Sequence, residues 1–373
     1  MAESATVYGK YTLGSGEVLS DPEWLWRDLD DPLVLDSYEQ SIRKDLLKAG
    51  LSPDRLQSWA VMDVGTGRQA LALLRLGAKW VSHYDLSPEN VERVAHYIIT
   101  HKKQDRLGTT CCDLVTADLG DKKFNFIYLN GVAQHFSDVG AGLSNLFEHL
   151  LPGGYFWLYF YRAGTFHQFL MYMLRDLIHG SNVALDQKSA RDYFLNAMLT
   201  YSDRVSRNYL VSCFMDSLFT PYAHLYSLQT YLDFATACGF EVVSSSGIDP
   251  LGGQIDHFFS RPATVLTLKK AIASQVTVRV AEMLSPERAV NELDPKNYQH
   301  PDILKSIALY QKLKVLCVEA KVPASAVVSA VLRLYYFGTV TIAEPSYDST
   351  KRHVDLQHIL GNIIHLFTSE LSS

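Results

Sequence analysis

Residues 59–85 read WAVMDVGTGRQALALLRLGAKWVSHYD, and this stretch decides the fold. Its apolar first part ends at the Gly-Thr-Gly sequence 65–67, which predicts a strand that runs into a tight turn. A helix-like segment, 69–76, follows the turn, and a second predicted strand, 80–85, ends on Asp85. A strand, a helix and a second strand in this order predict a parallel α/β sheet.

The same alternation continues to residue 161 and returns after a break. Ser-Pro-Glu at 87–89 predicts the start of another helix, because serine caps the first turn and proline suits the first helical position. The expected strands lie at 59–64, 80–85, 109–115, 124–129, 155–161, 240–243 and 263–268, and the other expected helices at 38–47, 69–76, 143–150 and 227–238. Such alternation, with strands apolar on both faces, is typical of a sheet covered by helices on both sides.

The alternation divides the chain into four expected parts. Residues 1–55 are expected to form an N-terminal cap segment, and residues 56–161 with 225–270 the core. Residues 162–224, which are rich in aromatic helical stretches, are expected to be a helical lid inserted into the core, where they would bound an acceptor pocket or form the underside of a lid packed on the sheet. Residues 271–373 are expected to form a mainly helical C-terminal domain.

Composition excludes several classes of protein. Hydrophobic residues make up 47% and charged residues 20% of the 373 residues, so the chain can bury a core and is not dominated by disorder. A net charge of −6 argues against broad binding to nucleic acid, which needs a basic face. The five cysteines include no C-x-x-C pair, no metal site is predicted, and neither a signal segment nor a membrane span is seen. We expect a soluble, cytoplasmic protein.

The chemistry-bearing residues follow the first two predicted strands. Asp63, Gly65 and Gly67 stand at the end of the first strand, and Asp85 ends the second. In an open parallel sheet, ligands bind beyond the carboxyl ends of the strands; glycines let them approach the backbone, and an acid there can bind both hydroxyls of a ribose. This pattern indicates a nucleoside-containing ligand.

The residues that are missing narrow the ligand class. A dinucleotide fingerprint would place a third glycine at position 70, which is Ala70. Asp63 at the mouth would repel a pyrophosphate but suits the amino group and the sulfonium of S-adenosylmethionine, and the phosphate-binding lysine of a P-loop is absent. The balance favours S-adenosylmethionine as the cofactor.

Four segments in order, VMDVGTGRQALALLRLGA (61–78), HYDLSPENV (83–91), NGVAQHF (130–136) and LLPGGYFWLYFYRAG (150–164), resemble the core motifs of class I S-adenosylmethionine-dependent methyltransferases. The resemblance covers about residues 56–161 and 225–268. It implies a Rossmann-like, doubly wound methyltransferase sheet. The last hundred residues resemble, more weakly, a regulatory winged-helix domain appended to some methyltransferases, through the segment 323–342.

The resemblance also implies roles for particular residues. The glycine loop contacts the methionine part of the cofactor, Asp85 the ribose hydroxyls and Asp118 the adenine amine. The expected cofactor-binding residues are Tyr38, Asp63, Gly65, Gly67, Arg68, Asp85, Leu86, Asp118, Leu119 and Asn130. A base is needed only if the acceptor must lose a proton, and the candidates near the mouth are His135, His167 and His224, with Tyr161 as a further polar contact.

Each of these residues has a plainer interpretation. Asp63 could cap the loop and Asp85 could be a solvated strand end. Asp113 offers a second register for the acid assigned to Asp118. His135 could line the pocket, act as a base or orient its loop. Gln134 stands where relatives often have a second histidine, which puts a catalytic role for that segment in doubt.

These observations predict transfer of a methyl group from S-adenosylmethionine to an O or N atom of a small organic acceptor, such as a natural product. A protein or peptide methyltransferase and a non-catalytic S-adenosylmethionine-binding subunit are the alternatives. We expect a small-molecule partner, no nucleic acid or membrane, and dimerisation of identical chains or substrate capture by the C-terminal domain.

Overall fold

A seven-stranded sheet organises the computed structural model, which describes residues 11–12, 18–19, 32–180, 217–218, 220, 222–246, 263–271, 278–319, 322, 327–328, 331 and 352–369. The chain divides into two units. The first unit holds the described residues up to Tyr161, together with those at 220–246, 263–271 and 278–289. The second unit holds the described residues from Arg162 to 218 and from 290 onward.

The sheet lies in the first unit, in the strand order β5-β4-β3-β6-β7-β9-β8. β5, β4, β3, β6 and β7 pair in parallel, whereas β9 runs antiparallel to both β7 and β8. The strands are β3 (Ala60–Val64), β4 (Trp80–Asp85), β5 (Leu107–Cys111), β6 (Phe124–Asn130), β7 (Leu150–Tyr161), β8 (Phe240–Ser246) and β9 (Ala263–Lys270). A separate antiparallel pair joins β1 (Tyr11–Thr12) to β2 (Val18–Leu19).

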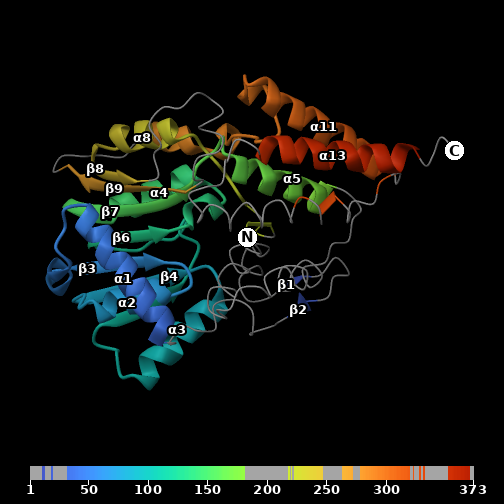
Figure 1. Ribbon diagram of the computed structural model, residues 1–373. Coiled ribbons are helices and arrows are strands. Elements are labelled where there is room, and N and C mark those ends of the chain that lie inside the picture. The colour runs from blue at the N-terminus through green and yellow to red at the C-terminus, as the bar shows by residue number, and fades with distance from the viewer. Residues whose placement is uncertain are drawn as a thin grey trace. The chain divides into compact units, whose positions relative to one another are not determined.

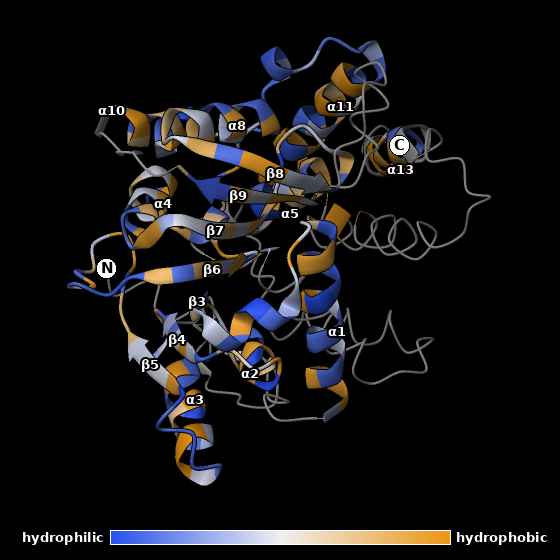
Figure 2. Ribbon diagram, turned by 90° about the vertical axis from the view of Figure 1, so that its left-hand side faces the viewer, coloured by the Kyte–Doolittle hydropathy of each residue, from blue (hydrophilic) through white to orange (hydrophobic). Residues whose placement is uncertain are grey.

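Helices cover both faces of this sheet (Figure 1). The first face carries α1 (Pro32–Lys48), α2 (Arg68–Arg75) and α3 (Pro88–Thr100), whose buried residues share one hydrophobic cluster with Val61, Val81 and Phe126 of the strands. The second face carries α4 (Val139–Glu148) and α8 (Leu228–Ala237), in a cluster with Met62, Ile127 and Phe156. Hydrophobic and hydrophilic residues alternate along α3, as expected of a helix with one buried side (Figure 2).

The predicted fold class is confirmed, and local sequence chemistry explains how the elements begin. The Ser87 hydroxyl accepts a hydrogen bond from the Asn90 N–H at 3.4 Å, with Pro88 at the first position of α3. Asp138 caps α4 through the Ala141 N–H at 2.8 Å, and Ser227 caps α8 through the Thr230 N–H at 3.1 Å. Each cap satisfies a backbone donor that has no partner inside the helix.

Two elements differ from the sequence prediction. The first helix begins at Pro32 rather than near residue 38, and its buried side chains Ile42 and Leu46 pack in the cluster that contains α2. This part of the expected cap segment therefore covers the sheet. The strand expected to reach residue 115 ends at Cys111, because the Asp113 side chain and carbonyl accept the N–H groups of residues 115–117 and form a turn.

The second unit joins two parts of the chain that the sequence analysis kept separate. Its helices are α5 (Phe166–Gly180), α11 (Pro301–Val318) and α13 (Arg352–Ser369). Phe169, Met173, Ile307, Leu313 and Leu360 belong to a single hydrophobic cluster. The Tyr310 hydroxyl donates to the Asp176 carboxylate at 2.7 Å. Phe166 and Phe169 of the expected lid are thus buried among helices of the expected C-terminal domain.

Most of the segment that resembles a winged helix, 323–342, lies outside the described residues. The division into lid and C-terminal domain therefore stays a prediction for those parts. Short 3-10 helices lie at Pro53–Ser58 and Ala133–His135. A short helix, α10 (Val278–Ala281), is followed by three more, at Glu282–Leu284, Pro286–Arg288 and Pro295–Asn297. Within the described chain, no helix combines the length and apolar character needed to cross a membrane.

Close packing of α4 in the first unit yields a stability prediction. A Cβ on Gly140 would lie 1.9 Å from the Ala281 carbonyl oxygen, a backbone atom that cannot move aside alone. We expect Gly140→Ala to lower the free energy of unfolding by about 1–3 kcal/mol, measured by urea denaturation followed by circular dichroism. Ser144→Ala on the same helix is the control, because the Ser144 hydroxyl has no hydrogen-bond partner among the described residues and its loss should be near neutral. Equal stability of the two variants would contradict this packing.

Candidate functional site

Strand register places the candidate residues in two rows across the first face of the sheet. The inner row runs from Thr109 on β5 through His83, Asp63 and Tyr128 to Trp157 on β7. The next row toward the carboxyl ends contains Cys111 and Asp85, which are partners, and Asn130 and Tyr159, which are also partners. Gly65 lies between these pairs, one residue past the end of β3. The sheet therefore gathers three predicted cofactor residues, Asp85, Gly65 and Asn130, at one edge.

The glycine loop turns the chain from β3 into α2. Gly65 has φ 125° and Gly67 has φ 92°, and residues other than glycine rarely adopt either backbone angle. A Cβ on Gly65 would also lie 3.3 Å from a methyl carbon of Val132. Gly67 occupies the N-cap position of α2 with no side-chain cap, so the first backbone N–H groups of the helix face the loop without a capping side chain. Such a helix start favours negatively charged or polar ligand groups.

Asp63 is fully buried beneath this loop. Its relative exposure is 0%, and neither carboxylate oxygen has a partner at hydrogen-bond geometry among the described residues. The pKa of Asp63 is raised to about 8, mainly by burial and also by the neighbouring Asp85, although the backbone N–H groups of Ala70 and Val64 favour the charged form. A buried carboxylate without a close partner is well suited to a cationic ligand group.

Asp85 is held by the start of α3. Its Oδ1 accepts a hydrogen bond from the Ser87 N–H at 2.6 Å. Burial raises the pKa of Asp85 to about 7, while the Ser87 N–H, the Asn90 side chain and Arg93 lower it. The Ser87 hydroxyl donates to Glu89 at 2.9 Å and so closes the turn after the strand. Asp85 is buried, which disfavours the interpretation of a solvated strand end.

The two candidate acids after β5 lie in different surroundings. Asp113 follows the strand directly, and the N–H of its neighbour Cys112 donates to the Asp85 carbonyl at 3.0 Å. Asp118 is exposed, and its carboxylate accepts the Gly120 N–H of its own turn at 2.8 Å. Leu119 is buried in the cluster of the second face, and Leu86 is half-buried. These surroundings favour Asp113 over Asp118 as the acid near the two rows.

A hydrogen-bonded loop pair follows Asn130. The Gln134 amide donates to the Gly131 carbonyl at 2.6 Å, and the His135 ring is bonded to the Tyr222 carbonyl through Nδ1 at 2.9 Å. The backbone carbonyl of Gln134 accepts a hydrogen bond from the backbone N–H of His224 at 2.9 Å, and this bond joins the segments 131–135 and 222–224.

These bonds bear on the role of His135. Since a carbonyl only accepts, Nδ1 of His135 carries the proton, and Nε2 accepts from the Gln134 amide at 3.1 Å. Both ring nitrogens are engaged, which favours the loop-orienting interpretation of His135 over a free base.

The remaining candidates are distributed over both units. In the first unit, the Arg68 guanidinium lies over the Tyr38 ring, 5.9 Å from its centre, so two predicted cofactor residues contact each other. Tyr161 ends β7 with its ring edge-on to that of Tyr159, at 5.8 Å. His167 belongs to the second unit, where burial lowers its pKa to about 3. His135 and His224 thus lie together in the first unit, and His167 belongs to the second.

Nothing in the sequence singled out His83. Its ring lies in the inner row, fully buried, with Nε2 2.6 Å from the Gly65 carbonyl oxygen and Nδ1 2.8 Å from the Thr109 hydroxyl. Burial lowers the pKa of His83 to about 4, so the ring is neutral near pH 7. The signal available in the sequence was only its position, two residues before Asp85 in a strand of parallel-sheet character.

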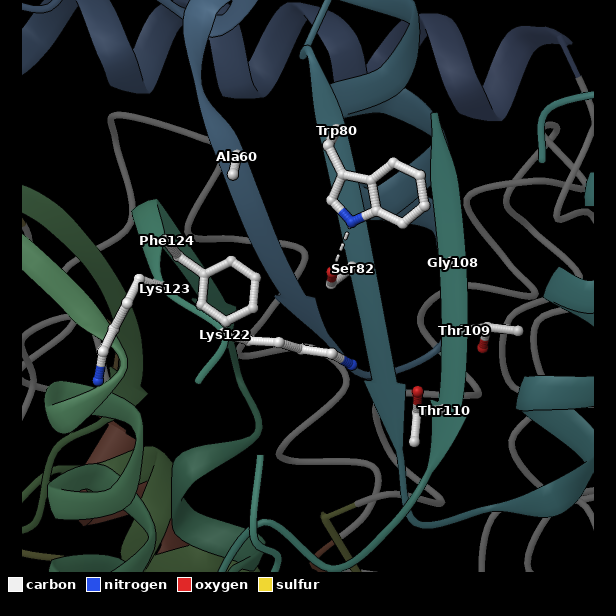
Figure 3. A pocket seen from close by; sticks show the side chains of 9 residues that line it. All are labelled: Ala60, Trp80, Ser82, Gly108, Thr109, Thr110, Lys122, Lys123 and Phe124. Atoms are coloured by element: carbon white, nitrogen blue, oxygen red, sulfur yellow. Dashed lines mark hydrogen bonds between the residues drawn. The ribbon is translucent and has the colours of Figure 1, made fainter. Parts of the chain in front are cut away.

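A cavity of about 340 Å³ lies on the opposite face of the sheet (Figure 3). Trp80 and Ser82 line it, and they alternate along β4 with Val81 and His83 of the first face. The Trp80 indole donates to Ser82 at 2.8 Å. The residues lining the cavity are Ala60, Trp80, Ser82, Gly108, Thr109, Thr110, Lys122, Lys123 and Phe124. Of the residues in the two rows, Thr109 alone also lines this cavity. Within the described residues, no group of three or more His, Cys, Asp or Glu side chains is placed to hold a metal ion.

Comparisons with known proteins found one family model and several similar solved structures. Residues 62–158, about a quarter of the chain, match a family model described as methyltransferase domain. Among solved structures, PKMT2 from Rickettsia typhi in complex with AdoHcy is 16% identical, with 65% of this chain and 54% of that chain covered and a TM-score of 0.44. An S-adenosylmethionine-dependent methyltransferase from Mesorhizobium loti is 17% identical, with 57% of this chain and 91% of that chain covered and a TM-score of 0.37.

A further similar structure is an O-methyltransferase family protein from Burkholderia thailandensis, 13% identical, with 66% of this chain and 63% of that chain covered and a TM-score of 0.38. The chain spans about half the length of the Rickettsia protein. No curated protein matched the chain.

The family match falls on the strands that carry Asp63, Asp85 and Asn130. This segment is a methyltransferase domain. The match agrees with the predicted resemblance to the class I S-adenosylmethionine-dependent methyltransferases, and it shows a methyltransferase domain over residues 62–158.

The burial of Asp63 predicts a pH-dependent stability. The folded chain keeps a proton on Asp63 up to about pH 8, whereas the unfolded chain releases it near pH 4, so the folded state loses stability as pH rises between these values. We expect Asp63→Asn and the unsubstituted protein to unfold alike below about pH 4, where both the folded and the unfolded chain keep this proton. At pH 8 the variant should be the more stable, the gap widening by at most about 1.4 kcal/mol per pH unit. Urea denaturation at several pH values measures the gap.

The exposed Asp105 provides the control for this experiment. Asp105→Asn should track the unsubstituted protein at every pH. A gap for Asp63→Asn that stays constant from pH 5 to pH 8 would contradict the assignment of a raised pKa to Asp63.

Proposed function

We propose that this chain binds S-adenosylmethionine at the edge formed by the glycine loop, Asp85 and Asn130 and transfers its methyl group to an O or N atom of a small organic acceptor. The observation that carries the proposal is the joint placement of Asp63, Gly65, Asp85 and Asn130 at the carboxyl edge of a parallel sheet. Ligands of open α/β sheets bind at this edge. The family match over the same strands supports the choice of cofactor.

The residues present fit this cofactor. The buried carboxylate of Asp63, without a close partner among the described residues, suits the cationic methionine end. The space beside Gly65, which a Cβ would fill, lets a ligand approach the backbone. Asp85 would hold the ribose hydroxyls through the capacity it has beyond its bond to the Ser87 N–H. Asp113 would take the contact with the adenine amine, which the sequence analysis assigned to Asp118.

When bound, S-adenosylmethionine supplies a methyl group activated by its sulfonium charge. The work of the chain is then to align donor and acceptor, since an in-line displacement gains most from positioning. The bonded segments 131–135 and 222–224 place Tyr222 and His224 beside the loop that follows Asn130. A proton released by an O–H or N–H acceptor would pass to His135 only after Gln134 gives up its bond to Nε2.

A small acceptor is favoured by charge. The chain has a net charge of −6, whereas binding to a nucleic acid needs a basic surface. A protein or peptide acceptor, and a non-catalytic binding subunit, are the alternatives that experiment must separate. Transfer of labelled methyl from S-adenosylmethionine to a small molecule by the purified chain supports the proposal. Label found only in protein favours the first alternative, and binding without any transfer favours the second.

Substitutions of the three acids test the cofactor assignment. Asp85→Ala should abolish the thermal stabilisation that S-adenosylhomocysteine gives to the protein, because both ribose hydroxyls lose their acceptor. Asp113→Ala should weaken binding about tenfold by calorimetry, whereas Asp118→Ala should leave it within about twofold. Full stabilisation of Asp85→Ala by S-adenosylhomocysteine would refute the site. The reverse ranking of Asp113 and Asp118 would restore the first assignment of the adenine contact.

We also propose that the second unit mediates dimerisation of identical chains. Val315 and Val318 on α11 have relative exposures of 55% and 66%, high for apolar side chains. We expect Val315→Glu with Val318→Glu to convert a dimer to a monomer in sedimentation, with Lys305→Glu on the same helix as the charge control. A monomeric unsubstituted protein would exclude this use.

A further inference from the structure

The His83 ring hydrogen-bonds to β5 and to the glycine loop that follows β3. It projects from β4, its Nε2 lies 2.6 Å from the Gly65 carbonyl oxygen beyond β3, and its Nδ1 lies 2.8 Å from the Thr109 hydroxyl on β5. The side chain has a relative exposure of 0%, so no bulk water competes for either bond. Two hydrogen bonds from one buried ring connect the glycine loop to the sheet.

The partners fix the protonation of this ring. The Gly65 carbonyl can only accept, so Nε2 carries the proton and donates it. Nδ1 then bears the lone pair, and the Thr109 hydroxyl donates to it. The ring is neutral with both nitrogens satisfied, and neither is available to take a proton from a substrate. The arrangement suits a residue that fixes the glycine loop rather than one that transfers protons.

The bond to Gly65 acts on the part of the loop that secondary structure leaves free. Gly65 has φ 125°, and its N–H already donates to the Tyr84 carbonyl at 3.0 Å. His83 captures the other backbone group of the same residue. Because a trans peptide is planar with its C=O and N–H pointing in opposite directions, fixing the Gly65 carbonyl also directs the Thr66 N–H away from His83.

Resting on the proposed function, we infer that His83 is a positioning residue: it holds the Gly65–Thr66 peptide in the orientation that the cofactor binds. Without the bond, a loop with left-handed residues at both 65 and 67 has other orientations open to it. Binding of the cofactor would then have to order the Gly65–Thr66 peptide, and the affinity for the cofactor would fall. Asp63 lies beside His83 in the same row, so the loop orientation also sets what covers that carboxylate.

Replacement residues can separate the two bonds of the ring. Glutamine places its amide nitrogen near the position of Nε2, so His83→Gln keeps a donor for the Gly65 carbonyl. Asparagine reaches only the position of Nδ1, so His83→Asn keeps a partner for Thr109 and leaves the Gly65 carbonyl without one. Thr109→Val removes the other bond while leaving the Gly65 bond in place. All three changes disturb buried polar groups, so the three variants control one another for stability.

The test measures affinity for S-adenosylhomocysteine by calorimetry, and kcat and KM for S-adenosylmethionine wherever transfer is seen. We expect His83→Asn to weaken binding about tenfold or more and to raise KM in proportion. His83→Gln and Thr109→Val should stay within about threefold of the unsubstituted protein. Circular dichroism and the melting temperature establish that each variant is folded under the assay conditions.

Two results would overturn the inference. Equal affinity of His83→Asn and the unsubstituted protein would leave His83 a purely structural residue. Equal losses in all three variants would show that affinity follows general damage to the sheet rather than the Gly65 bond. Should the unsubstituted protein not bind S-adenosylhomocysteine at all, the proposed function fails first; binding by it with no effect of His83→Asn rejects this inference alone.

Discussion

The left-handed turn at Gly65–Gly67 is the constraint on which the site depends. It brings the chain from β3 into α2 within three residues, and any side chain at position 65 would meet Val132. The parallel register then brings the ends of β4 and β6 to the same edge, with Asp85 and Asn130 beside the loop. A ligand site arises there because the ends of several parallel strands coincide.

Burial gives this edge its electrostatic character. Asp63 and Asp85 both have pKa values raised by desolvation, to about 8 and about 7. Two carboxyl groups so close to the interior cost free energy when charged, and a cationic ligand relieves that cost. His83, which is neutral near pH 7, adds no charge beside Asp63.

Much of this could be predicted from the sequence, and the rest could not, for physical reasons. Strands such as 80–85 and caps such as Ser87 are local, so composition and periodicity identify them. The family resemblance assigns the adenine contact to Asp118 and leaves Asp113 as an alternative; the end of β5 at Cys111, which decides which acid lies nearer the edge, cannot be located within a few residues from the sequence. His83 makes one bond to the glycine loop and one to β5, 18 and 26 positions away, and no local pattern in the sequence indicates such contacts. The shared core of α5, α11 and α13 is likewise a contact over more than a hundred residues.

The central claim is that the edge formed by the glycine loop, Asp85 and Asn130 holds the cofactor. Hydrogen–deuterium exchange with and without S-adenosylhomocysteine tests it most directly, because exchange is read at every backbone amide of the full chain. The account predicts slower exchange on binding in the segments 64–70, 85–90 and 130–135, and no change around Trp80 and Lys122. Slowed exchange confined to the cavity on the opposite face, or unchanged exchange in the glycine loop of a protein that binds the ligand, would contradict it.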